Sequence, residues 1–296
     1  MLEAAAELIR AGRLVAFPTE TVYGLGANAL DPVAVERIYR AKGRPPTSPL
    51  IVHVDSIEMA RRLAADWPEA ADVLARRFWP GPLTLVLTKQ SQIPDAVTAG
   101  LPTVGLRQPD HPVALALIRE SGVPIAAPSA NRFSELSPTT AAHVRASLGD
   151  AVDLILDGGP TRVGIESTVV SLAGPRPCLL RPGMVTQAQI EELIGPLEVA
   201  RRVSGDEAHP SPGMHRRHYS PRTPVLLGPP PATGRGVYLC FTGCMPNDPV
   251  AYAAILYETL HRLDAENLDW IAVEPPPETP AWAAVRDRLI RASDSK

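Results

Sequence analysis

Apolar residues along the first 200 positions fall into two patterns, and each pattern predicts its own kind of element. Short continuous apolar runs are typical of buried strands, whereas apolar residues with a helical spacing are typical of helices packed on one face. The predicted strands are residues 14–17, 50–54, 83–87, 123–127, 152–156 and 167–172. The predicted helices are residues 1–12, 31–42, a helix that opens at 66–69, and residues 111–120, 137–149 and 186–194.

Helix starts are marked by residues that satisfy free backbone N–H groups. Asp31 precedes a proline, and so does Ser137, so each pair combines an N-cap side chain with proline at the first helical position. Thr186 and Gln189 have the spacing of a capping box. Strands and helices mix without strict alternation, which favours an α/β fold with a twisted mixed sheet over a closed parallel barrel.

The pattern changes at residues 201–223, where prolines and charged residues replace the apolar periodicity. We interpret this stretch as a linker. Beyond it, the predicted strands are residues 225–227, 236–241 and 270–273, and the predicted helices are residues 250–263 and 281–292. The chain is therefore expected to hold two unequal α/β domains, residues 1–200 and residues 224–296, joined by the linker.

Composition narrows the class of protein. Hydrophobic residues make up 45% of the chain and charged residues 21%, as in a globular protein, and no apolar stretch reaches the roughly 20 residues of a membrane helix. The amphipathic N-terminal segment carries acidic residues and fits neither a secretory signal nor a transit peptide, so we expect a cytoplasmic location without membrane contact. Cys178, Cys240 and Cys244 form no C-x-x-C pair, which argues against disulfides and a structural zinc site.

The net charge of −3 at pH 7 argues against a protein that is held on nucleic acid mainly by phosphate contacts. A local basic patch stays open as an alternative. Its candidate residues are Arg40, Lys42, Arg44, Arg61, Arg62, Arg76 and Arg77. A non-catalytic RNA-binding module of this kind would bind with a steep salt dependence.

Residues 24–29 spell G-x-G-x-x-A, which matches a dinucleotide-binding fingerprint in letters but not in context. That fingerprint joins a strand directly to a helix, whereas here Pro18 interrupts the approach and the next helix starts only at Asp31. We interpret residues 24–29 as a turn that uses the tolerance of glycine for positive φ. The sequence contains no Walker A motif, no H-E-x-x-H and no G-x-S-x-G.

Lys42 and Arg44 lie at the end of a predicted helix and are followed by the hydroxyls of Thr47 and Ser48. Cations suit a helix C-terminus for purely structural reasons. However, only three of the 29 lysine and arginine residues are lysines, so a lysine here suggests a position where arginine would not serve. An ammonium and a guanidinium fork both contact phosphate well, which makes the segment a candidate for phosphate binding.

Further candidates lie at strand ends. Residues 128–131, P-S-A-N, follow a predicted strand, where small polar residues either bind ligands or form turns. Single polar residues beside or at the end of strands are Thr21, His53, Thr103, Arg107, Ser167 and Arg181. Arg107 is suited to bind the carboxylate of an amino-acid ligand, and a histidine or a serine is suited to bind the hydroxyl of that ligand.

The linker carries a histidine pair and an aromatic residue among cations. His215 and His218 have no further metal ligands nearby, so we expect no metal site there. Tyr219 among arginines better suits a flap that closes over a charged nucleotide and excludes water.

Six motifs occur along the chain in the order of one known family. They are F-P-T-E-T-V-Y-G-L-G at 17–26, K-G-R-P at 42–45, P-S-A-N at 128–131, G-I-E-S-T-V-V at 164–170, R-P-G at 181–183 and S-P-G-M-x-x-x-H-Y-x-P at 211–221. Together they resemble the long, two-domain form of the threonylcarbamoyl-AMP synthase (L-threonylcarbamoyladenylate synthase) family. The resemblance implies a catalytic domain whose twisted mixed sheet holds a central cleft, a linker that crosses the cleft, and a small Rossmann-like C-terminal domain.

The resemblance also implies which residues bind the substrates. Its pattern assigns L-threonine to Thr21, His53, Arg107, Ala127 and Ser167. It assigns ATP to Arg44, Ser48, Thr103, Ser129, Asn131, Ser137, Arg181 and Tyr219. Lys42 and Arg44 are the implied catalytic residues, and no metal ligand is assigned.

The activity implied by the resemblance is synthesis of L-threonylcarbamoyladenylate and pyrophosphate from L-threonine, bicarbonate or CO2, and ATP, with Mg2+ as cofactor. The product serves N6-threonylcarbamoyladenosine modification of tRNA, so the expected partners are the three substrates, with a transient contact to tRNA or to the downstream threonylcarbamoyl transferase. A carbamoyl transferase of the hydrogenase-maturation type is an alternative, because it contains a domain that resembles this one. It carries cysteine-rich zinc modules ahead of that domain, which are not expected here.

Overall fold

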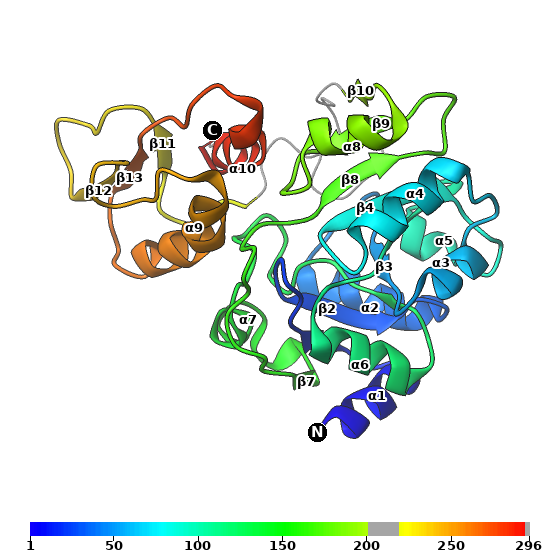
Figure 1. Cartoon of the computed structure of the whole chain (residues 1–296). Helices are drawn as coiled ribbons and strands as arrows, with labels where there is room; N and C mark the ends of the chain where they lie inside the picture. The colour runs from blue at the N-terminus through cyan, green and yellow to red at the C-terminus, as the bar shows by residue number, and fades with distance from the viewer. Residues whose placement is uncertain (201–218, 294–296) are drawn as a thin grey trace.

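The computed structural model describes residues 1–200 and 219–293, which build a large mixed sheet with its helices and a smaller sheet with helices of its own (Figure 1). Most of the predicted linker, including His215 and His218, lies outside the described residues. So does the greater part of the motif at 211–221, although Tyr219 is described.

The large sheet has ten strands within the described residues, in the order β10-β9-β8-β4-β5-β3-β6-β2-β1-β7. They are β1 (Val15–Phe17), β2 (Gly24–Asn28), β3 (Ile51–His53), β4 (Leu83–Thr88), β5 (Thr103–Arg107), β6 (Ile125–Ala126), β7 (Leu154–Ile155), β8 (Thr168–Ser171), β9 (Cys178–Arg181) and β10 (Glu198–Val199). Parallel pairs such as β3 with β5 stand beside antiparallel pairs such as β4 with β5. The predicted mixed sheet is thus confirmed.

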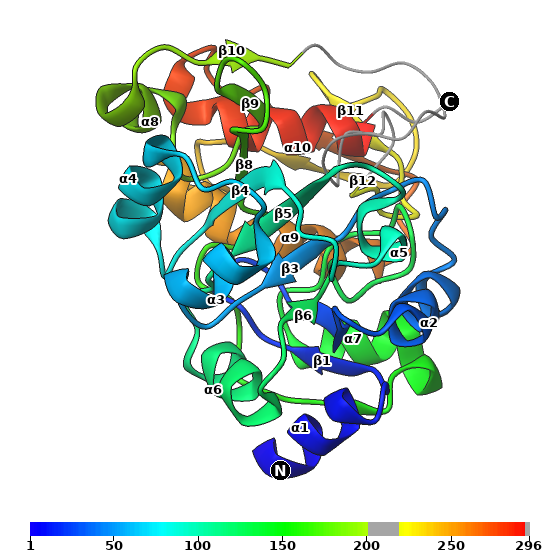
Figure 2. The same cartoon turned by 90° about the vertical axis from the view of Figure 1, so that its right-hand side faces the viewer.

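Helices lie on both sides of these strands (Figure 2). They are α1 (Leu2–Arg10), α2 (Pro32–Lys42), α3 (Ile57–Leu63), α4 (Glu69–Phe78), α5 (Asp95–Thr98), α6 (Pro112–Ser121), α7 (Ala141–Leu148) and α8 (Gln187–Ile194). The apolar pattern does not predict α3 and α5, which are short. Within residues 1–200 and 219–293, none of the helices combines the length and the apolar character needed to cross a membrane.

Two of the three predicted helix caps are confirmed. The side chain of Asp31 accepts hydrogen bonds from the backbone N–H groups of Val33 and Ala34, and Thr186 forms a complete capping box with Gln189. The predicted start at Ser137 is wrong, because α7 begins later and is capped by Thr140. Ser137 instead donates its hydroxyl to a buried carboxylate, described below, so the side chain is not free to cap a helix.

The predicted turn at residues 24–29 is also wrong, because β2 runs through it as an inner strand between β1 and β6. Gly26 is required there for space, since a Cβ atom on it would lie 2.7 Å from the Phe17 ring and 2.8 Å from a methyl group of Ile125. Gly26 therefore allows close packing of the strand.

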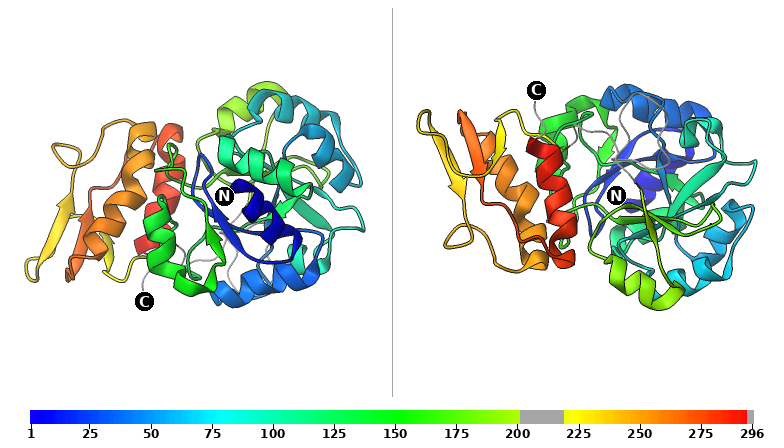
Figure 3. Two further views of the ribbon diagram at one scale, coloured as in Figure 1. Left: turned by 90° about the horizontal axis from the view of Figure 1, so that it is seen from below. Right: turned by 90° about the horizontal axis from the view of Figure 1, so that it is seen from above.

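The smaller sheet is parallel, with β11 (Val225–Leu227) and β12 (Gly236–Leu239) on either side of β13 (Trp270–Val273). Its helices are α9 (Pro249–Asp264) and α10 (Ala283–Ser293), and they lie between this sheet and the larger body (Figure 3). These elements confirm the α/β pattern predicted beyond the linker. Side chains of both bodies share one apolar cluster, in which Val22 and Ile165 join Leu256 and Val285.

Candidate active site

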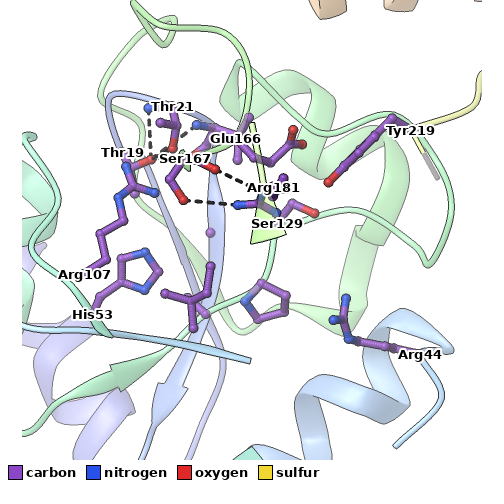
Figure 4. Close-up of a pocket in the computed structure, with 15 residues that line it drawn as sticks. Thr19, Thr21, Arg44, His53, Arg107, Ser129, Glu166, Ser167, Arg181 and Tyr219 are labelled. Atoms are coloured by element: carbon purple, nitrogen blue, oxygen red, sulfur yellow. Dashed lines mark hydrogen bonds between the residues drawn. The ribbon is translucent and has the colours of Figure 1, made fainter. Parts of the chain in front are cut away.

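A cavity lies among the ends of the central strands and the loops that connect them. Its walls are formed by Thr19, Thr21, Val22, Gly24, Arg44, Ile51, His53, Arg107, Ala127, Pro128, Ser129, Glu166, Ser167, Arg181 and Tyr219. Figure 4 shows Arg107 and His53 at one end, Arg44 and Tyr219 at the other, and Ser167 and Arg181 between them. Segments that are far apart in the sequence thus meet in one place.

The cavity contains nine of the residues that the sequence assigns to the substrates. They are Thr21, Arg44, His53, Arg107, Ala127, Ser129, Ser167, Arg181 and Tyr219. The remaining assigned residues, which are Lys42, Ser48, Thr103, Asn131 and Ser137, do not line it. Their positions are described below, because three of them contact residues that do.

Arg107 and His53 lie side by side because each ends one of two neighbouring parallel strands. The guanidinium of Arg107 donates from Nε to the Gly81 carbonyl at 3.2 Å and lies 2.8 Å from the carboxylate of Glu20. That close approach to Glu20 lacks the alignment of a hydrogen bond, so Nη2 of Arg107 has no hydrogen-bond partner among the described residues. A buried donor in this state is the kind of group that a ligand satisfies.

His53 is buried and uncharged. Burial in a low-dielectric environment, together with the positive charge of the neighbouring Arg107, lowers its pKa to about 3. Its Nδ1 atom, like Nη2 of Arg107, has no hydrogen-bond partner among the described residues. This end of the cavity therefore offers one cation and one neutral ring nitrogen to a ligand that carries an anion and a polar group.

Arg181 and Ser167 form the middle of the cavity. Arg181 donates from Nε to the Ser167 carbonyl at 3.0 Å and from Nη2 to its hydroxyl at 3.1 Å. The same hydroxyl lies 2.8 Å from that of Thr84 in β4. Burial lowers the pKa of Arg181, although the group remains a cation at neutral pH.

Arg44 and Tyr219 form the other end. The guanidinium of Arg44 donates to the hydroxyl of Ser48 at 2.5 Å and to the Pro49 carbonyl at 3.0 Å, so Ser48 orients Arg44 without lining the cavity. Burial lowers the pKa of Arg44 to about 10. Tyr219 is 1% exposed and has a φ of 63°, a left-handed conformation that non-glycine residues seldom adopt.

Lys42 is buried behind the cavity wall. Its ammonium donates to the carbonyl oxygen of Ser129 at 2.5 Å and to that of Asn131. Burial is the main reason that its pKa lies well below the ordinary lysine value, and the charge of Arg44 adds to the effect. In this structure Lys42 supports the loop that carries Ser129, and its ammonium does not face the cavity.

The other assigned residues outside the cavity have separate positions. Asn131 donates its amide to the carbonyls of Arg132 and Glu135 within its own loop. Thr103 is the first residue of β5 and pairs with Thr88 at the end of that strand pair. Ser137 donates its hydroxyl to Glu166 at 2.5 Å, so it contacts a residue of the wall.

Glu166 is the one charged residue of this lining that the sequence does not assign to a substrate, although it lies inside the motif at 164–170. Its carboxylate accepts hydrogen bonds from Ser137, from the Tyr257 hydroxyl at 3.1 Å and from Nε of Arg288 at 2.7 Å. The two last partners belong to α9 and α10, more than ninety residues away along the chain. Only the position of Glu166 beside Ser167 could have identified it.

Three buried arginines dominate the charge of the cavity. Arg44, Arg107 and Arg181 are each less than 7% exposed; Arg107 pairs with Glu20, and the carboxylate of Glu166 in the wall pairs with Arg288. Burying several cations around one cavity is unfavourable unless anions enter it. The arrangement is therefore suited to ligands that carry carboxylate or phosphate groups.

The side chains support the binding of a metal ion less well than the binding of anions. Among the described residues, no group of three or more His, Cys, Asp and Glu side chains is arranged to hold a metal ion. The one carboxylate in the wall, Glu166, already accepts three hydrogen bonds. The protein side chains described here therefore do not form a site for Mg2+.

Comparison with known proteins assigns both parts of the chain. A family described as "Telomere recombination" matches residues 7–183, and one described as "Threonylcarbamoyl-AMP synthase, C-terminal domain" matches residues 185–294. The chain is 46% identical to a threonylcarbamoyl-AMP synthase of Bacillus subtilis over 99% of its own length and 92% of that relative. It is 44% identical to the Pyrococcus abyssi enzyme of the same name, over 98% of this chain and 93% of the relative.

A solved structure shares the whole fold. The crystal structure of P. abyssi Sua5 complexed with L-threonine matches with a TM-score of 0.91 and 41% identity, over 99% of this chain and 94% of that chain. Since the match covers nearly the whole of both chains, it includes the large sheet and the smaller one.

Proposed function

Because the chain belongs to the threonylcarbamoyl-AMP synthase family, we propose that its cavity joins L-threonine, bicarbonate or CO2, and ATP into threonylcarbamoyl-AMP with release of pyrophosphate. The enzyme is thus a nucleotidyltransferase. The observation that best supports the site is the burial of three arginines around one cavity in which Arg107 and His53 each keep a polar atom without a hydrogen-bond partner among the described residues.

We assign L-threonine to the end of the cavity that holds Arg107 and His53. The carboxylate would bind the guanidinium of Arg107, which has donors to spare beyond its bond to Gly81. The neutral ring of His53 and the hydroxyls of Thr21 and Ser167 suit the hydroxyl and amine of threonine. The relative solved with L-threonine supports this assignment of ligand class.

We assign ATP to the opposite end, where Arg44, Ser129 and Tyr219 lie, with Arg181 between the two substrates. The side chains of Ser48, Asn131 and Ser137 act from behind this wall, as Lys42 does, because each contacts a wall residue or its loop. Thr103 makes no such contact with the residues that the structure describes, and its predicted role in ATP binding stays a prediction.

The proposed reaction begins with attack of the threonine amine on CO2, which forms a carbamate N–C bond with loss of one proton. A carbamate oxygen then attacks the α-phosphorus of ATP, the bond from that phosphorus to the bridging oxygen breaks, and pyrophosphate leaves. Arg44 and Arg181 would offset the negative charge of the phosphates, and a cavity lined by both substrate ends would bring the two anions close enough to react. Burial also protects the carbamate, which loses CO2 readily in water.

Mg2+ enters this proposal only as a companion of ATP. Since the described side chains do not form a metal site, Mg2+ would arrive on the oxygens of the triphosphate, which is where it commonly binds. It would supply charge neutralisation there. No step assigned above to a residue of this chain depends on it.

The RNA-binding alternative is weakened by burial. Lys42 and Arg44 are 3% and 6% exposed and donate to groups of the protein itself, so they cannot contribute to a surface patch. Arg61 and Arg76 both pair with Asp72. Delivery of the product to tRNA through a downstream transferase stays a prediction. So do the boundaries that we propose for the catalytic domain (1–200), the linker (201–223) and the C-terminal domain (224–296).

The decisive experiment follows labelled bicarbonate into an AMP-linked product. The protein is incubated with ATP, Mg2+, L-threonine and radiolabelled bicarbonate, and threonylcarbamoyl-AMP and pyrophosphate are measured together. We expect both to appear in equal amounts and only when threonine is present, with L-valine as the matched control for the hydroxyl. Pyrophosphate release without threonine, or RNA binding without any product, would contradict the proposal.

A further inference from the structure

One residue of the cavity wall is held in place by side chains of the second body. Glu166 lines the cavity, and two of the three groups that donate to its carboxylate are Tyr257 of α9 and Arg288 of α10. The helices α9 and α10 face the larger body in two further views (Figure 3). The active-site wall thus depends on side chains from more than 90 residues further along the chain.

Arg288 is held as firmly as a core residue. Its side chain is fully buried, and its three guanidinium nitrogens donate to different groups. Nε reaches the Glu166 carboxylate at 2.7 Å, Nη2 reaches the Glu166 carbonyl at 3.2 Å, and Nη1 reaches the Pro182 carbonyl at 3.1 Å and Asp287 at 2.7 Å. A lysine could not make these contacts at once, because only a guanidinium presents a planar fork of donors.

The same guanidinium supports Tyr219. Its central carbon lies 5.4 Å from the centre of the Tyr219 ring, within the range of a cation–π contact. The ring of Tyr257 approaches Tyr219 at 5.9 Å from the same body. Since Tyr219 has a backbone conformation that is unfavourable for tyrosine, its place in the wall depends on such neighbours.

The loop that carries Glu166 is shaped for this contact. Gly164 has a φ of 78°, and a Cβ atom on it would lie 2.3 Å from the Ala253 carbonyl of α9. Any side chain at this position would push α9 away from the loop. The glycine of the motif at 164–170 therefore allows the second body to approach the cavity wall.

We propose that Arg288 is a positioning residue for the nucleotide end of the active site, so that the cavity of the large sheet is incomplete without the C-terminal helix α10. This inference rests on the function proposed above, in which Tyr219 and its neighbours bind ATP. Arg288 itself does not touch substrate, because it is not among the side chains that line the cavity. It acts through Glu166 and Tyr219.

The threonine end does not share this dependence. Ser167 is next to Glu166, but its hydroxyl contacts Thr84 and Arg181, both from the large sheet. Arg107 is held by Gly81 and Glu20, also from the larger body. Loss of Arg288 should therefore affect ATP and threonine unequally, which separates positioning from a general loss of structure.

The test measures binding of ATP and of L-threonine separately, by titration calorimetry on the full-length chain. In Arg288→Met we expect the Kd for ATP to rise at least about tenfold, while the Kd for threonine changes less than about threefold. Arg286→Met is the matched control, because Arg286 lies on the same helix and pairs with Glu278 of its own body. This control should bind both ligands as the unaltered protein does.

If Arg288→Met does not fold, Arg288→Lys provides a second test of the inference. It retains a cation beside Glu166 but loses the fork, and we expect its KM for ATP to rise at least about fivefold with an unchanged KM for threonine. Wild-type ATP affinity in either folded variant, or equal losses for both ligands, would overturn the inference. A failure of the unaltered protein to form threonylcarbamoyl-AMP would instead overturn the proposed function, which the binding titrations do not measure.

Discussion

Arg107 gives the sharpest test of how the cavity recognises threonine. Truncating it would confound two effects, because Glu20 is 1% exposed and lies 2.8 Å from the guanidinium. Removing one partner of such a buried pair costs about 3–5 kcal/mol of stability. The informative change is therefore Arg107→Lys, which keeps a cation near Glu20 and removes only the fork.

The expected loss follows from the number of donors. A guanidinium can meet a carboxylate with two hydrogen bonds, whereas an ammonium in its place makes one well-aligned bond. A hydrogen bond to a charged group contributes about 1.5–3 kcal/mol, so the Kd for threonine should rise about 10- to 150-fold. The Kd for ATP should stay unchanged, because Arg44 and Tyr219 lie at the other end of the cavity.

Titration calorimetry with L-threonine measures this difference directly. Arg119→Lys is the matched control, because its side chain is 60% exposed and lies 3.9 Å from Asp55, away from the lining residues. Wild-type threonine affinity in Arg107→Lys would refute the assignment of the carboxylate to Arg107. A matching loss in Arg119→Lys would show that the effect is not local.

Two further predictions concern buried titratable groups. Lys42→Ala leaves the carbonyl oxygens of Ser129 and Asn131 without the ammonium that donates to them. We expect kcat/KM for ATP to fall at least about 100-fold while the circular dichroism spectrum stays unchanged. Normal turnover would refute the supporting role of Lys42. Burial, together with the charge that the stacked His143 carries when protonated, lowers the pKa of His261 to about 4, so the unfolded chain binds a proton at His261 near pH 6.5 and the folded chain only near pH 4. The stability that neutral His261 contributes is fully present above pH 6.5 and is lost as the pH falls toward 4. When the pH is lowered from 7 to 5, the free energy of unfolding of the unaltered protein should therefore fall by about 2 kcal/mol more than that of His261→Gln. Equal losses in denaturant titrations of the two proteins would contradict this sign.

Local signals in the sequence predicted local structure well. The caps at Asp31 and Thr186 depend on residues within one helical turn, and both are confirmed. The strand β2 was missed because its glycines resemble a turn until Phe17 and Ile125 are known to pack against them. The predicted cap at Ser137 was wrong for the same reason, since its hydroxyl donates to Glu166, 29 residues away, and not to a backbone group of a helix.

In the candidate site, too, local features could be predicted from the sequence, whereas contacts between distant residues could not. Residues at strand ends, such as His53 and Arg107, could be recognised because an apolar run followed by one polar residue is visible in the sequence. The supporting role of Lys42 and the tie between Glu166 and Arg288 could not, since these contacts span 87 and 122 residues. Whether a polar residue faces a ligand or holds the wall is decided by distant packing.

The outermost strands of the large sheet, β7 and β10, have two residues each. An unpaired strand edge can serve as a template on which another chain adds its own strand, and long flat edges are prone to aggregation for that reason. Within the part of the chain that the structure describes, each edge strand offers only a very short row of backbone groups, and Glu198, paired with Arg176, places a carboxylate at one of them. The ten-stranded sheet is consequently poorly suited to growing by edge-to-edge stacking of copies, even in a crowded solution.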